Sequence, residues 1–274
     1  MSYIVGIDIG GSTTKIIGMR GDTTAKPVKV RASDPITSAY GAFGRFLTEN
    51  ALRLEDVQQV MFTGVGSSFI NQGLFGIRSE KVDEFLAIGR GGKYLTHMDR
   101  CIVVSMGTGT ALVGVEGGNV THLGGTGVGG GTLMALSDKL LGVHSFSHLM
   151  ELARSGNLSK VDLTIGDITE EGSLANMGAD ITASNLGNIS DTATSSDLAM
   201  GIVNLVYQSI GMFAVFAAQA REIRDIVLTG NLSTIDFVGP LVFDRLEELY
   251  PVRFIKPDQA EFATAIGAAL SARI

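Results

Sequence analysis

The sequence predicts an α/β protein made of two related lobes. An apolar strand, a short polar turn rich in Gly and Thr, and a second strand follow one another near residue 10 and again near residue 107. Strands and helices alternate along the rest of the chain, which is typical of an α/β fold. The repetition indicates a duplicated fold, so we expect an N-terminal lobe over residues 1–99 and a C-terminal lobe over residues 100–274.

The composition favours a globular protein of a reducing compartment. The chain has 274 residues, of which 45% are hydrophobic and 18% charged, enough for buried cores in one large or two medium domains. The single cysteine, Cys101, cannot form an internal disulfide, and the sequence has no Cys/His cluster with zinc or iron–sulfur spacing. The N-terminal apolar run contains an Asp and lacks the basic start of a signal peptide. We therefore expect a cytoplasmic protein.

The charge argues against nucleic-acid and membrane partners. The formal net charge is −7, whereas nucleic acids and anionic membranes require clustered Lys and Arg. The stretch from Ala199 to Ala220 approaches the length of a membrane-spanning helix. It lacks basic flanks and aromatic belts, and polar residues interrupt it at Asn204, Gln208, Ser209 and Gln219. We expect a buried central helix there, and neither of the two kinds of partner.

The individual elements follow from local patterns. Asp34 and Pro35 indicate a helix start, because Pro is favoured at the first helical position. Residues 116–119 have the composition of a hairpin turn. Strands are predicted over residues 3–9, 14–19, 59–63, 101–105, 111–115 and 225–228, and helices from residue 35 and over residues 82–95, 132–141, 199–220 and 262–270.

The first glycine turn is a candidate phosphate site. It combines a carboxylate, two glycines, two hydroxyls and a cation, at Asp8, Gly10, Gly11, Ser12, Thr13 and Lys15. Glycines allow main-chain N–H groups to converge on phosphate oxygens, and the hydroxyls add donors. Asp8 can hold Mg²⁺ through water, while Lys15 either approaches a γ-phosphate or is solvated. The spacing is neither a Walker loop nor a dinucleotide fingerprint, and a simple tight hairpin is the alternative.

Three further glycine-containing segments extend this candidate site. The second turn comprises Gly107, Thr108, Gly109 and Thr110, and two such turns in opposing lobes could hold a triphosphate from both sides. A glycine run before Thr132 is expected to point free amides of a helix N-terminus at an anion; its members are Gly127, Gly129, Gly130 and Gly131. Gly230 and Asn231 follow a strand and could let an adenine or ribose approach the backbone, although alone they indicate only a turn.

Phosphoryl transfer also needs a general base, and Glu84 is the candidate in the first half. It follows Asp83 near a predicted helix start. Acidic pairs at this position usually do no more than complement the helix dipole, so both interpretations stay open on pattern alone. The spacing of His144 and His148 favours a polar helix face over a metal site.

Several motifs together resemble one known family. GIDIGGSTTK at residues 6–15, SMGTGTALV at residues 105–113 and GGTGVGGGT at residues 124–132 are similar to segments of the type II, eukaryotic-like, pantothenate kinases of the acetate kinase, sugar kinase, Hsp70 and actin superfamily. DITASNLG at residues 180–187 and FATAIGA at residues 262–268 continue the resemblance. It implies a two-lobed, ribonuclease H-like duplicated fold, as in the actin and Hsp70 ATPases, with a nucleotide cleft between the lobes.

The resemblance also implies an activity and its residues. The expected reaction is phosphorylation of pantothenate by ATP and Mg²⁺ to 4′-phosphopantothenate, the first step of coenzyme A biosynthesis. Glu84 falls where the family keeps its catalytic base, Asp8 would serve the metal, and the two turns match the family's phosphate segments. The resemblance also implies a homodimer built around long helices. Coenzyme A or an acyl-CoA is a further candidate ligand, as a feedback inhibitor of the kinase.

One residue departs from the family pattern. His122 stands where the family commonly has an arginine for the carboxylate of pantothenate, next to the expected substrate residues Gly125 and Thr126. A neutral imidazole is a poorer carboxylate partner than a bidentate guanidinium. Either protonated His122 binds this carboxylate, helped by Arg90 or Arg78, or the substrate lacks one, as pantetheine does.

Three alternative functions occur within the same superfamily. An activator of 2-hydroxyacyl-CoA dehydratases needs at least two cysteines for an iron–sulfur cluster, and Cys101 stands alone. A sugar kinase normally has an Asp base in an N-x-D-type segment, which we do not find in the sequence. A nucleotide- or acyl-CoA-sensing module would share the cleft but would not need Glu84 as a base.

Overall fold

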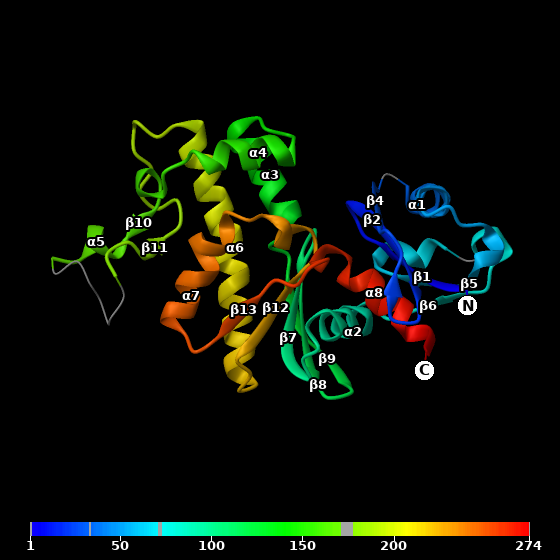
Figure 1. Ribbon diagram of the computed structural model, residues 1–274. Helices are drawn as coiled ribbons and strands as arrows, with labels where there is room; N and C mark the ends of the chain where they lie inside the picture. Colours follow the sequence, from blue (N-terminus) through cyan, green and yellow to red (C-terminus); the bar gives the residue numbers. More distant parts are fainter. Residues whose placement is uncertain (1, 33, 71–72, 171–177, 274) are drawn as a thin grey trace.

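Two β-sheets lie on either side of a pair of helices in the computed structural model, which describes residues 2–32, 34–70, 73–170 and 178–273 (Figure 1). The pair consists of α2 (Glu84–Thr96) and α8 (Ala263–Leu270). Both N-terminal and C-terminal ends of the chain lie on the side of the first sheet (Figure 1). The two expected layers of strands are therefore present, and the helices between them set their separation.

The first sheet has a mixed topology in the order β3-β2-β1-β5-β6, with β4 also paired to β2. The central β1 is antiparallel to β2 and parallel to β5. One face of the sheet packs against α1 (Pro35–Glu49), and the other against α8. The strands are β1 (Tyr3–Ile9), β2 (Thr13–Arg20), β3 (Thr23–Thr24), β4 (Val28–Arg31), β5 (Val57–Thr63) and β6 (Ser79–Lys81).

The second sheet repeats the pattern of the first in the order β13-β12-β7-β8-β9. Its β7 is antiparallel to β8 and parallel to β12, as β1 is to β2 and β5. This shared arrangement confirms the duplicated α/β fold expected from the repeated strand–turn–strand pattern. The strands are β7 (Arg100–Met106), β8 (Thr110–Glu116), β9 (Asn119–Thr126), β12 (Asp225–Thr229) and β13 (Arg253–Ile255).

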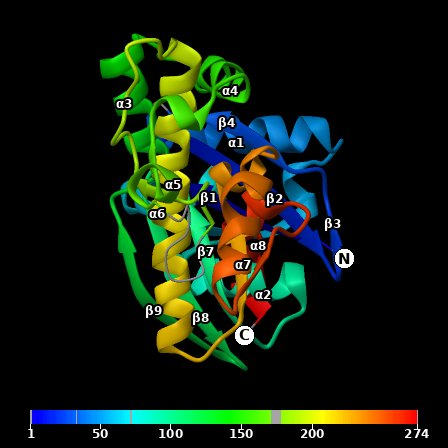
Figure 2. The same ribbon diagram turned by 90° about the vertical axis from the view of Figure 1, so that its left-hand side faces the viewer.

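The remaining elements lie on the outer side of the second sheet, and α5, β10 and β11 lie farthest from it, beyond α6 (Figure 1). The long α6 packs against its strands, and Figure 2 shows α6 running down the front of this lobe. The others are α3 (Gly130–Leu141), α4 (Phe146–Arg154), α5 (Ile165–Ile168), α6 (Ser195–Ala220), α7 (Asp244–Leu249), β10 (Leu163–Thr164) and β11 (Thr182–Ser184). The last two strands form a separate two-stranded sheet.

α6 is long and apolar enough to cross a membrane by length and composition, but it lies inside the protein. In its most apolar 18-residue window, 67% of the residues are buried. Ile202, Val206, Tyr207 and Ile210 lie in the largest core cluster together with side chains from β7 and β12. This burial agrees with the expectation of a central core helix.

The predicted start of α1 is confirmed. Asp34 is the N-cap, and its side chain accepts a hydrogen bond from the Thr37 amide at 2.7 Å. Pro35 occupies the first turn, where its missing N–H would have no intrahelical partner. Asn50 ends the helix.

Some predicted boundaries were wrong. α3 begins at Gly130, two residues before the predicted start at Thr132. Gly124 and Gly125, which were given no predicted element, belong to β9, which ends at Thr126. His144 precedes α4 and pairs with Asp138 at 3.0 Å, so it does not share a helix face with His148 as predicted. Within the described residues, no group of three or more His, Cys, Asp or Glu side chains could hold a metal ion.

The contact between α2 and α8 is made by backbone. A Cβ atom built on Gly91 would lie 1.8 Å from the Ala263 carbonyl oxygen, and one built on Gly267 would lie 1.8 Å from the Ala87 carbonyl oxygen. α2 also packs against β7, β8 and β9, whereas α8 packs against β1, β2 and β5. Glycine at both positions therefore lets the helices join the two sheets at close range.

We expect Gly267→Ala to lower the free energy of unfolding by about 2–3 kcal/mol, because the added methyl group would push α8 away from α2. Gly41→Ala in α1 is the control, since a Cβ there meets nothing within 4 Å. It should raise the free energy of unfolding by about 0.5–1 kcal/mol through helix propensity. Urea unfolding of both variants measures the difference, and an unchanged stability of Gly267→Ala would contradict the close backbone contact.

Candidate active site

Both glycine turns line one cleft of about 300 Å³ between the sheets. The cleft brings together most of the residues that the sequence singled out. From the N-terminal part of the chain these are Asp8, Gly10, Gly11, Ser12, Thr13, Lys15 and Glu84, and from the C-terminal part Gly107, Thr108, Gly109, Thr110, Thr126, Gly230 and Asn231. The predicted two-sided arrangement of the turns is therefore present.

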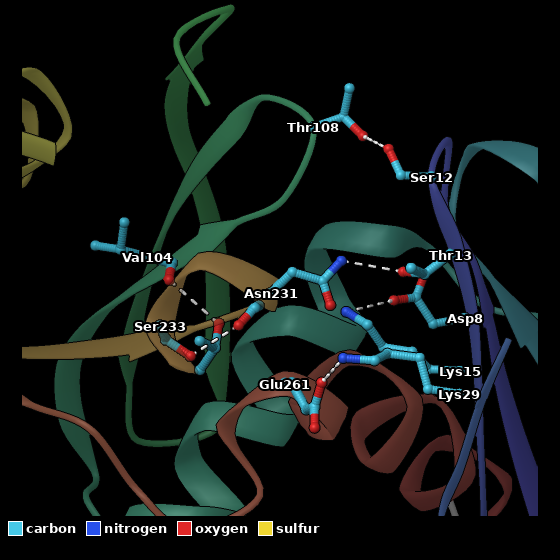
Figure 3. A network of polar contacts seen from close by, with 12 residues as sticks. Asp8, Ser12, Thr13, Lys15, Lys29, Val104, Thr108, Asn231, Ser233 and Glu261 are labelled. Carbon is cyan, nitrogen blue, oxygen red and sulfur yellow. Dashed lines mark hydrogen bonds and ion pairs between the residues drawn. The ribbon is translucent and has the colours of Figure 1, made fainter. Parts of the chain in front are cut away.

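Two hydrogen bonds cross the cleft from the first turn, one to the second turn and one to the loop after β12 (Figure 3). The hydroxyls of Ser12 and Thr108 are 3.0 Å apart, and the Asn231 side-chain amide donates to the Thr13 hydroxyl at 3.0 Å. All four side chains are polar groups of the kind that bind phosphate or ribose oxygens. In this state the three hydroxyls and the Asn231 side-chain N–H group are paired with one another, whereas the buried side-chain oxygen of Asn231 has no partner among the described residues. A bound ligand would exchange these contacts for its own.

Each turn is held in shape by its own backbone. The Gly10 amide donates to the Thr13 carbonyl at 3.0 Å, which closes the hairpin between β1 and β2. In the second turn, the Gly107 amide donates to the Gly109 carbonyl at 2.9 Å. The first turn is thus the tight hairpin considered as an alternative, and its side chains still face the cleft.

A pair of opposite charges lies beneath the first turn. Asp8 and Lys15 face each other on β1 and β2, with 4.0 Å between Oδ2 and Nζ, and both side chains are buried. Burial raises the pKa of Asp8, and the nearby Lys15 partly opposes this. Burial also lowers the pKa of Lys15, against the attraction of Asp8 and Glu261. Each group therefore depends on opposite charge close by to remain ionised.

The surroundings of Asp8 suit a hard cation that also binds phosphate. A Cβ on Gly64, whose φ is 84°, would lie 2.6 Å from Asp8 Oδ1, so only glycine leaves room for the carboxylate. Thr63 is the cross-strand neighbour of Asp8, and among the described residues its buried hydroxyl oxygen has no hydrogen-bond partner. Mg²⁺ commonly takes one or two carboxylates together with phosphate and water oxygens. The residues present fit such an ion.

Glu84 is the first residue of α2 and points into the same cleft. Asp83 before it is the N-cap and accepts a hydrogen bond from the Leu86 amide at 2.9 Å. Burial raises the pKa of Glu84, and the negative charges of Asp8 and Asp83 raise it further. A carboxylate with a raised pKa is a stronger proton acceptor, as a general base requires. Asp83 supplies the helix cap, which leaves Glu84 available to the cleft.

A second cavity of about 320 Å³ continues from the first. The two share Ser12, Thr13, Gly107, Thr108 and Asn231, so these residues stand where the cavities meet. The second cavity also has apolar walls, formed by Met134, Phe146 and Leu232. It contains two cations, Lys29 and Arg31, which were not predicted from the sequence. The alternating basic residues of VKVR at 28–31 are the signal that could have identified the cations.

The loop after β12 lines the second cavity and is fixed by contacts with β7 and α6. Gly230 has φ 88°, and a Cβ there would lie 2.5 Å from the Met106 carbonyl oxygen. The buried Tyr207 hydroxyl of α6 donates to the Leu232 carbonyl at 2.8 Å. The core helix therefore fixes the loop that places Asn231 beside Thr13.

The prediction of free amides before α3 was wrong. The Gly130 amide donates to the Gly107 carbonyl, and the Gly131 amide donates to the Thr108 carbonyl, both at 2.9 Å. A Cβ on Gly129 would lie 2.6 Å from that same Thr108 oxygen. The glycine run therefore supports the second turn from below. Gly127 lies on the same loop, and its carbonyl accepts from the Thr132 hydroxyl at 2.9 Å.

The expected carboxylate partners are placed elsewhere. His122 is exposed on β9 and stacks on Phe85, with ring centroids 3.7 Å apart and an interplanar angle of 13°. Arg90 donates to the Ser271 hydroxyl at 2.8 Å, and Arg78 pairs with Glu80 at 2.6 Å. Neither guanidinium group supports the predicted role beside His122. The stacking does place His122 against the residue that follows Glu84.

Of the two other expected substrate residues on β9, only Thr126 lines the cleft. Gly125 is exposed and pairs with Ala111 of β8, and a Cβ on it would lie 2.6 Å from the Thr110 carbonyl oxygen. Thr126 lines the first cavity, and its hydroxyl accepts a hydrogen bond from the Val128 amide at 3.1 Å.

Similar proteins with solved structures share this fold. (R)-2-Hydroxyglutaryl-CoA dehydratase component A of Acidaminococcus fermentans superposes with a TM-score of 0.68 at 20% identity, covering 99% of this chain and 97% of that one. A ROK hexokinase of Thermus thermophilus superposes with a TM-score of 0.57 at 13% identity, covering 98% of both chains. These neighbours confirm the two-lobed α/β architecture that was expected from the sequence.

Sequence comparison narrows the group. A protein of Bacillus cereus (strain G9842) named type II pantothenate kinase is 28% identical, over 84% of this chain and 84% of its own. One of the same name from Oceanobacillus iheyensis is 28% identical, over 97% of this chain and 98% of its own. The sequence model of the Fumble family matches residues 100–236, half of the chain. The chain therefore belongs to the Fumble family.

Proposed function

We propose that the protein transfers the γ-phosphoryl group of ATP to the primary hydroxyl of pantothenate, giving 4′-phosphopantothenate, the first step of coenzyme A biosynthesis. The observation that carries this proposal is the position of Glu84 in the same cleft as both glycine turns. The relatives named type II pantothenate kinase support the choice of acceptor. Cys101, the only cysteine, is buried, and burial raises the pKa of its thiol to about 11, which argues against an iron–sulfur activator.

The residues of the cleft divide the chemical work. Glu84 would take the proton of the acceptor hydroxyl while the hydroxyl oxygen forms a bond to the γ-phosphorus and the bond to ADP breaks. The amides and hydroxyls of the two turns and the ammonium group of Lys15 would stabilise the charge on the transferring group. Mg²⁺ held by Asp8 would neutralise the phosphate oxygens. The apolar walls of Met134, Phe146 and Leu232 would accept the adenine.

A second acceptor, pantetheine, has a specific observation in its favour. Among the described residues that line the first cavity, Lys15 is the only Lys or Arg, and it is paired with Asp8. Pantothenate would bring a carboxylate towards this acidic region, where Glu84 and Asp8 already lie. Pantetheine has no carboxylate and would avoid this repulsion.

The same proposal includes a cellular compartment, an oligomeric state and a feedback ligand. A cytoplasmic homodimer would suit the reaction, and Phe213 and Phe216 on α6 are 46% and 56% exposed, which supports contact between long helices of two copies. Coenzyme A or an acyl-CoA would bind as a feedback ligand in the nucleotide cavity. Neither a nucleic acid nor a membrane is part of this proposal.

We expect Glu84→Gln to lower kcat by about 10²–10⁴-fold, because the amide cannot accept the hydroxyl proton. ATP affinity should stay close to that of the unaltered protein. A coupled ADP-release assay with pantothenate measures the rate, and Glu55→Gln, in the exposed 3-10 helix Leu54–Asp56, is the control. Full activity of Glu84→Gln would exclude Glu84 as the base, and absence of ADP release by the unaltered protein with pantothenate and pantetheine would favour a sensing module.

Activity should fall as the pH decreases through the raised pKa of Glu84, because only the ionised carboxylate accepts a proton. Asp83→Asn keeps a good N-cap and removes one of the charges that raise this pKa. The acidic limb of the kcat profile should therefore move to lower pH in this variant. Asp22→Asn, outside the cleft, should leave the profile unchanged, and a shift of the Asp83→Asn limb to higher pH would contradict the electrostatic account.

His122→Arg should raise the ratio of kcat/KM for pantothenate to that for pantetheine by about tenfold, the scale of one charge-assisted hydrogen bond. Arginine can keep the stacking on Phe85 and present a bidentate donor. Assays with both acceptors give the ratio, and the exposed His148→Arg is the matched control. An unchanged ratio would place the acceptor's carboxylate away from residue 122.

A further inference from the structure

Charged side chains form a row across the cleft face of the first sheet. Asp8 of β1 is opposite Lys15 of β2, and Lys15 is opposite Lys29 of β4. Arg31 lies two residues after Lys29 and therefore on the same face of β4. Directly opposed like charges on neighbouring strands destabilise a sheet. The Lys15–Lys29 pair therefore needs a compensating charge, in a chain whose overall charge is negative.

Glu261 supplies this compensation from the segment that precedes α8. It lies in the short helix Ala260–Phe262 before α8, and its carboxylate pairs with the Lys29 ammonium group (Figure 3). It also favours the charged form of Lys15, whose pKa burial lowers. The Lys29 and Glu261 side chains are 42% and 23% exposed, so the pair is open to solvent and to ligands.

The Lys29–Glu261 pair lies close to the expected position of the nucleotide phosphates. Lys29 lines the second cavity together with Ser12, Thr13 and Asn231, the residues at which the two cavities meet. A nucleotide with its base against the apolar walls of the second cavity and its γ-phosphate near Glu84 would place its phosphates at this junction. Lys29 would then face phosphate oxygens on one side and the Glu261 carboxylate on the other.

We propose that Glu261 is an internal counter-ion for Lys29 that the nucleotide phosphates replace, so that Lys29 is a phosphate-binding residue and Glu261 a competitor for it. This inference rests on the nucleotide site of the proposed function. A carboxylate and a phosphate are alternative partners for one ammonium group, which can donate three hydrogen bonds. Glu261 thereby keeps the paired lysines neutralised in the empty cleft and weakens ATP binding by the strength of its own ion pair.

A double-mutant cycle in ATP affinity tests this competition. Calorimetric titration with ATP and Mg²⁺ is compared for the unaltered protein, Glu261→Gln, Lys29→Ala and the double variant. Glu261→Gln should tighten ATP binding by about two- to fivefold, the scale of a partly exposed ion pair. Lys29→Ala should weaken it by about tenfold or more. Glu261→Gln should have less than about a twofold effect once Lys29 is absent, and adenosine affinity should not change in any variant.

Matched controls separate this from general changes in charge. Lys26 and Glu49 form an ion pair of 3.0 Å that is likewise partly exposed. Both residues belong to the N-terminal part of the chain, and neither lines the two cavities. Glu49→Gln and Lys26→Ala should leave ATP affinity unchanged, and thermal unfolding followed by circular dichroism verifies that each variant is folded. Equal tightening by Glu49→Gln would overturn the proposal, because only the net charge would then matter.

The outcomes also separate this inference from the proposed function. If ATP binds the unaltered protein but Glu261→Gln weakens binding, leaves it unchanged or has the same effect with and without Lys29, the competition is overturned and the kinase proposal stands. If ATP does not bind the unaltered protein, both are overturned.

Discussion

The backbone contact between α2 and α8 fixes the relation between the two sheets, and the cleft depends on it. α8 packs on the first sheet, where a Cβ on Gly6 of β1 would lie 1.9 Å from the Ala265 carbonyl oxygen. α2 packs on the second sheet and against α8. Glu84 begins α2, so the same contact that joins the sheets places this carboxylate in the cleft with Asp8. A bulkier residue at Gly91 or Gly267 would alter the cleft as well as the core.

The polar groups of the cleft surround two buried charges, Asp8 and Lys15, that each need an opposite charge nearby to remain ionised. Burial acts in opposite directions on Asp8 and Lys15, raising the pKa of the first and lowering that of the second. A bound polyphosphate with its cation would supply charge to both, because the cation favours the carboxylate and the phosphates favour the ammonium group. Ligand binding is therefore expected to stabilise the site electrostatically as well as through hydrogen bonds. A protein of net charge −7 can therefore bind an anion at this site.

Much of the fold and part of the site could be predicted from the sequence. The repeated strand–turn–strand pattern is local, and hydrophobic alternation with Gly/Thr turns was sufficient to identify both halves and the two turns. Contacts between distant segments could not be predicted in this way. The amides of Gly130 and Gly131 were expected to be free, but the carbonyls of the second turn accept from them.

The missed residues have the same cause. Lys29 lies in an ordinary short strand, and Glu261 precedes an apolar terminal helix. Their proximity arises only when β4 and the segment before α8 meet at the cleft. His122 was singled out through the family resemblance, yet its stacking on Phe85 depends on how β9 packs against α2. Residue type and spacing along the chain contain no information on such pairings.

A crystal structure with a non-hydrolysable ATP analogue, Mg²⁺ and pantothenate is the most direct test of phosphoryl transfer in this cleft with Glu84 as the base. We expect the γ-phosphate to lie between the two glycine turns, the ion to lie at Asp8, and the acceptor's primary hydroxyl to lie within hydrogen-bonding distance of a Glu84 carboxylate oxygen. A nucleotide bound outside this cleft, or an acceptor hydroxyl directed away from Glu84, would contradict it.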